Sequence, residues 1–478
     1  MFRPQHALSL VLMLLTLLPA LGDCAESQSQ TAQPPTQMAQ PKDPNVLTLD
    51  EALLLALENH PSLSAARERV AAQRAVLGQQ MGGYYPTINM TNQYRSGTEA
   101  GTTSTSANGF DFFNSQFNFS MILYNFGKRE GAVQAARETL TAVDYNYKTA
   151  VDSVVLGVKQ AYYAYLQARA IVNVREDTVK SRDLLVKQTQ SFFEVGTRAR
   201  IDVVRAESNL YTAQADLIAA RNAVQVAWVT LKNALGLRNL PERPLVEDTT
   251  MTTIPYTLDE AKEIAYSTRP ELKSFEAQRR AQDQNIATAR RGHLPDLIFD
   301  ANWRRSDVSN GATAESICTQ TLIATDTNNV PTEFCAKRQT ITHSVDTFPL
   351  KPAWQVQLSL NIPIFDGFRT TNRVEETLHT YYVIKAQEEQ QRQQVALDVE
   401  QSYLRLVELR ERIKANEAAA TAAKENLDLA NGRYQVGVGS IIEVTDAQQL
   451  YTDAQTTYVR ALYDYKIADA QLTRAIGK

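Results

Sequence analysis

The feature that most constrains this chain is an internal duplication that covers most of its length. The segment TLDEA at 48–52 recurs at 257–261, an offset of 209 residues (257 − 48), and the same offset relates the prolines that follow. Further on, Gly196 and Gly437 each follow an aromatic residue, a polar residue and a valine, at an offset of 241 residues (437 − 196). A solenoid is excluded, because its repeats are only about 20–50 residues long. The sequence predicts one large module copied once in tandem.

Each copy is predicted to contain short helices, two strands and a long helical hairpin. Thr48 and Thr257 each precede a glutamate by three residues, a spacing that predicts a capping box at a helix start. No proline interrupts 87–240 or 364–478, so both runs can hold long helices. We expect a first copy over 47–247, with strands at about 85–96 and 112–125 and a hairpin over 128–236, and a second over 248–478, with strands at about 296–306 and 352–365 and a hairpin over 368–477.

The four predicted strands are apolar on one face and polar on the other. An antiparallel sheet on an ordinary core would also alternate, but a lipid-exposed outside and a wet lumen explain both faces of the long last strand, in which apolar residues occupy positions 354, 356, 358, 360, 362 and 364. Four strands cannot close a barrel, which needs about eight, so we expect the barrel to be shared between chains. Aromatic residues at the strand ends suit membrane interfaces, namely Tyr94, Tyr124, Trp303, Trp354 and Phe365.

The helical runs predict an extended coiled coil. A helix from about 128 to 195 would be about 100 Å long at 1.5 Å per residue. An apolar stripe with 4,3 spacing follows its middle, at positions 151, 155, 158, 162, 165 and 172. A globular helix bundle would give a similar stripe, but helices of this length do not fit an ordinary domain. Gly196 and Gly437 predict the reversals, after which helices of about 35 residues return from Asp202 and Glu443.

The N-terminal region predicts secretion. An apolar run over 7–18 follows Arg3, and residues 20–22 have the small-x-small form of a signal-peptidase site, so we expect a signal peptide over 1–22. A membrane anchor is the rival interpretation, but the run is shorter than the about 20 residues that a spanning helix needs. A third interpretation is lipid attachment at Cys24, although an acidic residue precedes it where lipid attachment needs a small one. Residues 23–46, rich in Gln and Pro, predict a disordered leader.

Cys318 and Cys335 lie where the second copy is about 30 residues longer than the first (241 against 209). A secreted chain meets oxidising conditions, so we expect a disulfide across these 17 positions (335 − 318). Two free thiols are the alternative, and they would be reactive outside the cell.

Composition and motifs argue against several classes of function. The chain has 49 basic and 53 acidic side chains, a net charge of −4, and no long basic run, so we expect no nucleic-acid partner. Its five histidines are scattered, and none lies at metal-ligand spacing from another or from a cysteine, so we expect neither a metal site nor a cofactor. No nucleophile elbow, zinc-protease motif, P-loop or dinucleotide fingerprint occurs, so we expect no enzymatic activity.

The ordered set of motifs resembles the TolC-type outer membrane efflux proteins (outer membrane factors) of Gram-negative bacteria, from about 46 to 478. The most specific pieces are the duplicated opening, the junction IFDG at 364–367, and the segment from Tyr434 to Ala447 with its first-copy partner. The resemblance implies a mixed α and β fold, mainly of long helices, in a homotrimer. Each chain would give four strands to a 12-stranded transmembrane β-barrel and four long helices to a coiled-coil tunnel in the periplasm.

The resemblance implies a function as the outer membrane exit duct of a tripartite efflux or type I secretion system. The implied partners are outer membrane lipid, a periplasmic adaptor (membrane fusion) protein and an inner-membrane ABC or RND-type pump, and the cargo would be drugs or protein. The competing hypothesis is a trimeric coiled-coil adhesin or receptor that uses the same strands as an anchor. An adhesin would project its helices outside the cell, whereas a duct has them in the periplasm and the loops near 97–111 and 306–350 outside.

The family pattern places the pore constriction at the second-copy turn, where Glu443 and Asp446 lie one helical turn apart. Three chains would then put six acids around one axis, a ring that attracts cations. Acids that merely stabilise a helix N-terminus are the simpler alternative. The expected latch of the closed channel lies at the first-copy turn and comprises Asp202, Arg198, Arg200 and Arg205. We expect one or more of the arginines to pair with Glu443 or Asp446. The turns themselves, with Gly196, Gly437 and Gly439, are the expected adaptor-docking sites.

Overall fold

The computed structural model describes residues 46–100, 107–247, 250–251, 255–310, 313–325, 331–343 and 351–478. The predicted signal peptide (1–22) and, apart from Val46, the predicted leader (23–46) lie outside the described residues. The chain divides into two units. The smaller comprises 1–48 and 243–246, and in its described part Leu47 forms a parallel bridge with Leu245. The larger comprises 49–242 and 247–478 and holds every helix and strand named below.

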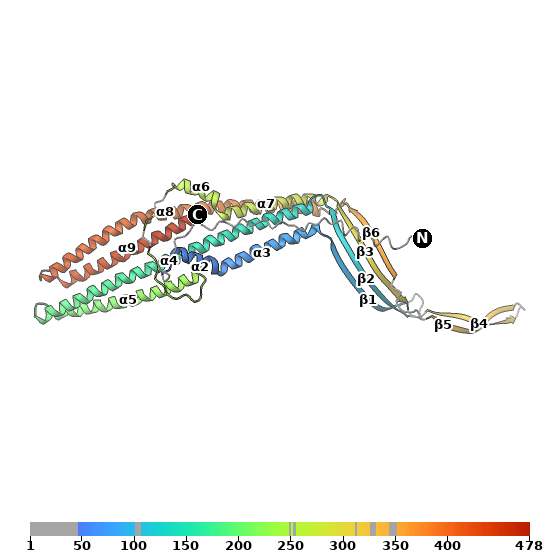
Figure 1. Ribbon diagram of the computed structural model, residues 1–478, viewed down its shortest axis with the longest axis horizontal. Coiled ribbons are helices and arrows are strands. Elements are labelled where there is room, and N and C mark those ends of the chain that lie inside the picture. The colour runs from blue at the N-terminus through green and yellow to red at the C-terminus, as the bar shows by residue number, and fades with distance from the viewer. Residues whose placement is uncertain are drawn as a thin grey trace. The chain divides into compact units, whose positions relative to one another are not determined.

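The structure is mostly helical, and the helices of the two halves match in length (Figure 1). The short helices contain 11 and 21 residues in each half, and the long helices α4 and α8 contain 67 residues each, about 100 Å at 1.5 Å per residue. The first half has α2 (Leu49–Asn59), α3 (Pro61–Met81), α4 (Lys128–Glu194) and α5 (Arg200–Ala234); the second has α6 (Leu258–Thr268), α7 (Pro270–Arg290), α8 (Arg369–Gln435) and α9 (Ile441–Ile476).

Local sequence explains where these helices begin. At Thr257 both bonds of the predicted capping box are present, because Thr257 Oγ1 accepts from the Glu260 backbone and the Glu260 carboxylate accepts from the Thr257 backbone. Proline at the first helical position starts α3 and α7, since its missing N–H would have no partner there. The return helices begin at Arg200 and Ile441, two residues earlier than we expected.

The junctions before the long helices use two successive residues with positive φ. They are Phe126 (54°) and Gly127 (83°) before α4, and Gly367 (67°) and Phe368 (63°) before α8. The glycine and phenylalanine exchange places between the copies, so the structural counterpart of Gly127 is Phe368 rather than Gly367. A phenylalanine in this region is strained. The offset of 241 residues that relates Gly196 to Gly437 gives the same pairing (368 − 127 = 241), although it aligns a glycine with a phenylalanine.

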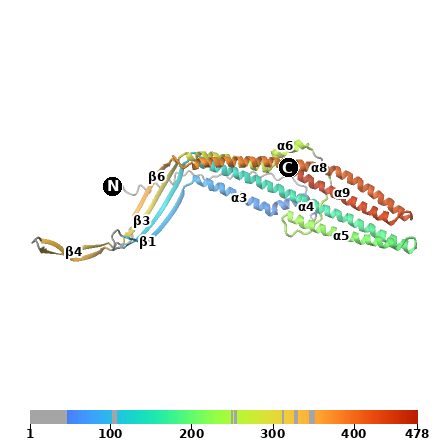
Figure 2. The same cartoon turned by 180° about the vertical axis from the view of Figure 1, so that it is seen from behind.

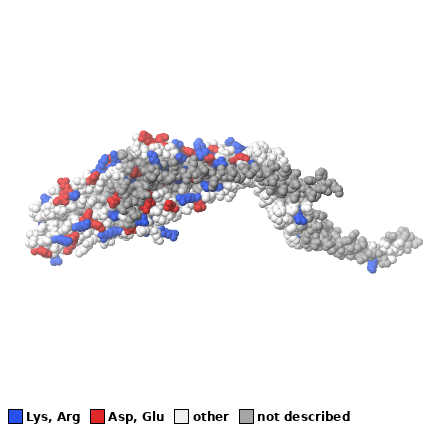
Figure 3. All heavy atoms as spheres, viewed as in Figure 1, with Lys and Arg blue, Asp and Glu red and all other residues white. Residues whose placement is uncertain are grey.

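Four strands form one antiparallel sheet in the order β1-β2-β3-β6, with bounds Thr87–Ala100, Ala107–Tyr124, Asp296–Asn310 and Lys351–Asn361. The register aligns apolar with apolar residues across the sheet, since Met90 pairs with Phe117, Phe117 with Trp303, and Trp303 with Trp354. This face is uncovered in the single chain, where Trp354 is 73% and Leu358 63% exposed. Figure 3 shows charged side chains spread over the helices, while the described part of the strand segment is mainly uncharged.

The strand bounds differ from the expected ones in two ways. The first three strands extend further into the intervening segments than predicted. The last ends at Asn361, four residues early, because Pro363 has no N–H to continue the ladder. Ile364 and Phe365 therefore lie beyond the strand in which we placed them, and Phe365 instead makes an edge-to-face contact with Phe368 at a centroid distance of 5.4 Å.

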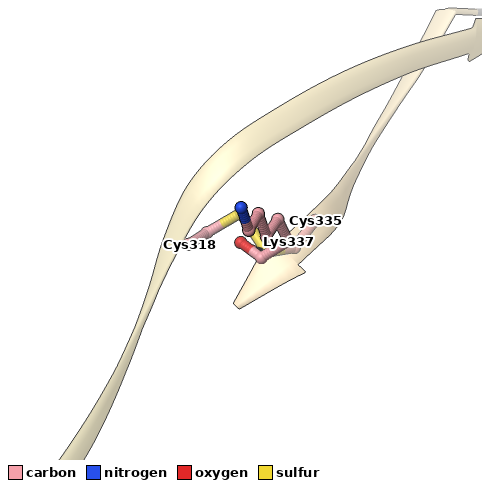
Figure 4. The surroundings of a disulfide bond; sticks show 3 residues. All are labelled: Cys318, Cys335 and Lys337. Carbon is pink, nitrogen blue, oxygen red and sulfur yellow. Dashed lines mark hydrogen bonds between the residues drawn. A yellow bond between two sulfur atoms is a disulfide. The ribbon is translucent and has the colours of Figure 1, made fainter. Parts of the chain in front are cut away.

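The cysteine segment, which we expected to be a loop, contains a two-stranded hairpin. Its strands are β4 (Thr313–Thr325) and β5 (Pro331–His343), paired antiparallel. A disulfide joins Cys318 and Cys335 across the hairpin, with Cα atoms 5.7 Å apart, and Lys337 lies beside it (Figure 4). The threonines that made the segment look like a polar loop are β-branched, as are its isoleucines, and such residues favour strands.

The long helices pack side by side around narrow apolar cores (Figures 1 and 2). Helix α4 contacts α3, α5, α7 and α9, and α8 contacts α7 and α9. One core cluster joins α6, α7, α8 and α9, with Val395, Val399, Leu406 and Ile413 of α8 buried against Tyr465 and Leu472 of α9. No helix among the described residues has an apolar stretch long enough to cross a membrane.

Candidate functional site

The two helical hairpins α4–α5 and α8–α9 end in turns at the same end of the helices (Figures 1 and 2). We call these turns, residues 195–199 and 436–440, the tips. Gly196 and Gly437 have φ of 77° and 83°, a conformation in which a side chain would be strained, so glycine permits both reversals. Ser440 begins α9 as its N-cap, with its hydroxyl oxygen 3.2 Å from the Glu443 backbone nitrogen.

A shared apolar cluster holds the two tips together. Its members come from α4, α5, α8 and α9, and all are buried: Leu185, Ala206, Leu427, Ala430, Tyr434, Ile441, Val444 and Ala447. Small and β-branched residues at spacings of three and four allow the four helices to approach closely. The polar side chains at the tips are therefore held in position by this packed apolar cluster.

Arg198 links the two tips directly. Its guanidinium donates a hydrogen bond of 2.9 Å to the carbonyl oxygen of Gly439 in the other hairpin and lies 4.9 Å from the centroid of the Tyr434 ring. Gly439 is required for the tightness of this turn, since a Cβ atom there would approach the backbone of Arg433 and Tyr434 to 3.0 Å. The contact combines a charge-assisted hydrogen bond with a cation–π interaction.

Tyr434 is the centre of this contact. The side chain is 1% exposed, its ring packs on Phe192 at a centroid distance of 5.8 Å, and its hydroxyl has no hydrogen-bond partner among the described residues. Burial raises the pKa of Tyr434, the negative charge of Asp202 raises it further, and Arg198 opposes this shift. An unpartnered buried hydroxyl costs free energy, so this one polar atom lowers the stability of the packing around Tyr434.

Glu443 and Asp446 project from the start of α9, and both are exposed. The Glu443 carboxylate pairs with Arg433 of its own hairpin, at 3.2 Å between Oε2 and Nε. Asp446 makes no ion pair or hydrogen bond with another described side chain. Three residues apart on a helix, the two carboxylates lie on the same side.

The predicted latch pairs are not formed among the described residues of this single chain. Arg198 bonds to a backbone carbonyl rather than to Glu443 or Asp446, and Arg200 and Arg205 are exposed and form no ion pair with either acid in the part of the chain that the structure describes. Their pairing with the acids of a neighbouring chain stays a prediction. Sequence reasoning missed Arg433, although counting outward from the turn at 436–440 places it roughly opposite Glu443.

A row of polar contacts, which we call the polar ladder, joins α4, α5 and α9 a few helical turns away from the tips. Arg182 is buried and donates to the carbonyl oxygen of Asn209 at 2.8 Å and to Gln449 at 2.7 Å, while Thr178 contacts Thr452 at 3.1 Å. Burial lowers the pKa of Arg182, but two neighbouring carboxylates, Asp216 and Asp453, act in the opposite direction. The ladder fixes the register of the two hairpins and so positions the tips.

The predicted interface aromatics lie on or beside the sheet. Tyr94, Trp303 and Trp354 are in strands, Tyr124 ends β2, and all are exposed. Among the described residues, no group of three or more His, Cys, Asp or Glu side chains could hold a metal ion.

Comparison with known proteins gives consistent matches. A family model described as outer membrane efflux protein matches residues 52–237 and 263–478. The outer membrane protein TolC of Vibrio cholerae is 24% identical over 426 residues, which cover 88% of this chain and 89% of that protein. The outer membrane efflux protein BepC of Brucella suis is 24% identical over 435 residues, covering 90% and 85%. A crystal structure of CusC shares the fold, with a TM-score of 0.73 at 18% identity and coverage of 90% and 92%.

Proposed function

Because the chain belongs to the outer membrane efflux protein family, we propose that it forms the exit duct of a tripartite efflux or type I secretion system. The protein resides in the outer membrane. In this proposal it conducts small molecules or protein passively through a gated trimeric channel, and the energy comes from an inner-membrane ABC or RND-type pump that reaches it through a periplasmic adaptor.

The observation that carries the proposal is a sheet with an uncovered apolar face and two open edges. The strands alternate in direction, so β6 of one chain and β1 of the next can pair in the same antiparallel pattern. Three chains of four strands would close a 12-stranded barrel, which removes the edges and places the apolar face in lipid. Trp303 and Trp354 then lie toward a lipid–water interface.

The outer edges of the helical layer also support a trimer. Helix α5 exposes apolar side chains at heptad spacing, at Val204, Tyr211 and Ile218, and α8 exposes Leu397 and Leu404 seven residues apart. Such seams pack against a partner helix. Contact between α5 of one chain and α8 of the next would close a helical tunnel in the periplasm around the same threefold axis, with the tips at its far end. We assign the constriction to Glu443 and Asp446, and adaptor docking to the turns with Gly196, Gly437 and Gly439.

A charge on the lipid face should block assembly. Leu358→Arg is expected to remove the trimer from the outer membrane, since an arginine near the bilayer midplane costs about 2–4 kcal/mol per chain. The neighbouring change Gln357→Arg lies on the opposite face of β6 and should leave the trimer in place. Heat-modifiable migration of membrane-extracted protein in gel electrophoresis measures trimer formation in both variants. Equal loss in the two variants would contradict the barrel.

The orientation separates a duct from an adhesin. After mild reduction of intact cells, a membrane-impermeant maleimide should label Cys318 and Cys335, because their hairpin lies outside in a duct. A cysteine introduced at Val195, in the exposed tip, should be labelled only after the outer membrane is permeabilised. Labelling of the tip on intact cells would favour the adhesin.

The cargo is tested by deletion of the gene. Increased drug susceptibility with normal levels of secreted protein would indicate efflux, and the reverse would indicate type I secretion. Unchanged drug susceptibility together with unchanged secretion, in a strain that lacks related ducts, would contradict the proposed function.

A further inference from the structure

The polar face of the four-stranded sheet carries an ordered pattern that the duct function alone does not require. One cross-strand row consists entirely of carboxamides, because Asn89 pairs with Asn118, Asn118 with Asn302, and Asn302 with Gln355. Alternation places all four on the face opposite the apolar residues. In the proposed barrel this row lies on the inner wall, where it can both donate and accept hydrogen bonds.

Opposite charges flank the carboxamide row on β3. Asp300 lies two residues before Asn302, on the side of the helices, and Arg304 lies two residues after it, toward the distal loops. Four residues of strand separate the two charges by about 13 Å, so they cannot pair with each other. Neither forms an ion pair with another described side chain. Arg304 is exposed, and its row neighbours Thr91, Gln116 and Ala353 are uncharged.

The basic character continues toward the distal end. Arg95 of β1 is exposed and shares the face of Asn89 and Thr91, four residues beyond Thr91. Among the described side chains, the inner wall is thus acidic nearest the helices, neutral but hydrogen-bonding at the carboxamide row, and basic from Arg304 to Arg95. The basic part of this wall is opposite in sign to Glu443 and Asp446, which lie near the other end of the helices.

We propose that the inner wall of the barrel holds a binding site for small multivalent oxyanions, with the Arg304 side chains of three chains as its charge and the carboxamide rows as hydrogen-bond donors. The site rests on the proposed trimeric duct. Its ligands are compounds that carry several carboxylate, sulfonate or phosphate groups, because a guanidinium binds such groups through two parallel N–H donors. In the proposed trimer, threefold symmetry places three Arg304 charges at one level of the inner wall, and together they attract a multivalent anion.

The test uses the full-length trimer in nanodiscs of zwitterionic phosphatidylcholine, with 1,3,6,8-pyrenetetrasulfonate as a fluorescent anion. Fluorescence anisotropy should report saturable binding that weakens as salt rises. Arg304→Gln should raise the Kd about tenfold at 0.1 M salt, as three lost charges imply for a tetravalent ligand. Asp300→Asn should lower the Kd, since it removes the nearest repulsive charge.

Arg305 provides a matched control, because it is the next residue of β3, is also exposed and lies on the opposite face. Arg305→Gln should change the Kd by less than about twofold. Binding that is equal in Arg304→Gln and wild type, or that responds equally to both arginines, overturns the site. Tighter binding of a cationic pyrene also overturns it. Trimer formation and ion conductance of the same preparations are measured separately, so failure of the duct is distinguished from failure of the anion site.

Discussion

Replacing Glu443 and Asp446 together by alanine is expected to abolish most of the cation preference of the channel. In a trimer the two residues place six carboxylates around the axis, and a ring of like charge at a narrow point raises the local concentration of counter-ions. The cation-to-anion permeability ratio should fall at least about fivefold, and the effect should shrink at high salt because screening weakens the ring. Reversal potentials of single channels in a KCl gradient measure it.

The control for this prediction is a second pair of acids with the same spacing. Glu408 and Glu411 are exposed on α8, three residues apart, and lie more than 20 residues from the tip. Their replacement by alanine should leave the permeability ratio unchanged. An unaltered ratio in the Glu443 and Asp446 variant, or an equal loss in the control, would show that the constriction lies elsewhere. Glu443 would then serve only to pair with Arg433 and to stabilise the helix N-terminus by its charge.

Arg198→Ala should open the tips. The change removes the hydrogen bond to the Gly439 carbonyl and the cation over the Tyr434 ring, the direct polar links between the two tips. With allowance for partial exposure, these contacts contribute about 1–2 kcal/mol per chain. The equilibrium between closed and open tips should shift about 5–30-fold per chain, and mean single-channel conductance in planar bilayers should rise.

Two variants distinguish the loss of the specific contact of Arg198 with Gly439 and Tyr434 from a general loss of positive charge. Arg221→Ala removes an exposed arginine of α5 that is not among the latch candidates and should leave conductance near that of the wild type. Arg198→Lys keeps the cation over the ring but loses the planar fork of the guanidinium, so it should restore conductance in part. If Arg221→Ala opens the channel as much as Arg198→Ala, the contact with Gly439 is not what holds the tips closed.

The family and the outer membrane location were predicted from sequence and are confirmed by the comparisons. Helix starts were predictable where one residue decides them, as at Thr257, Pro61 and Pro270, because caps and proline act within one turn. The hairpin β4–β5 was missed because its polar β-branched residues were interpreted as a loop. The partner of Arg198 was missed because we sought an opposite charge, whereas the structure supplies a carbonyl oxygen and an aromatic face.

By itself, the sequence indicated an internal repeat, two-faced strands and the positions of the reversals, since these follow from self-similarity, from periodicity or from residues a few positions apart. Only the tertiary structure decided that β2 pairs with β3 of the second half and that Arg198 binds across to Gly439. These contacts join residues that are distant in sequence, and their geometry depends on how the two halves pack. A local sequence pattern indicates which residues could come into contact, but the packing of the two halves determines which of them do.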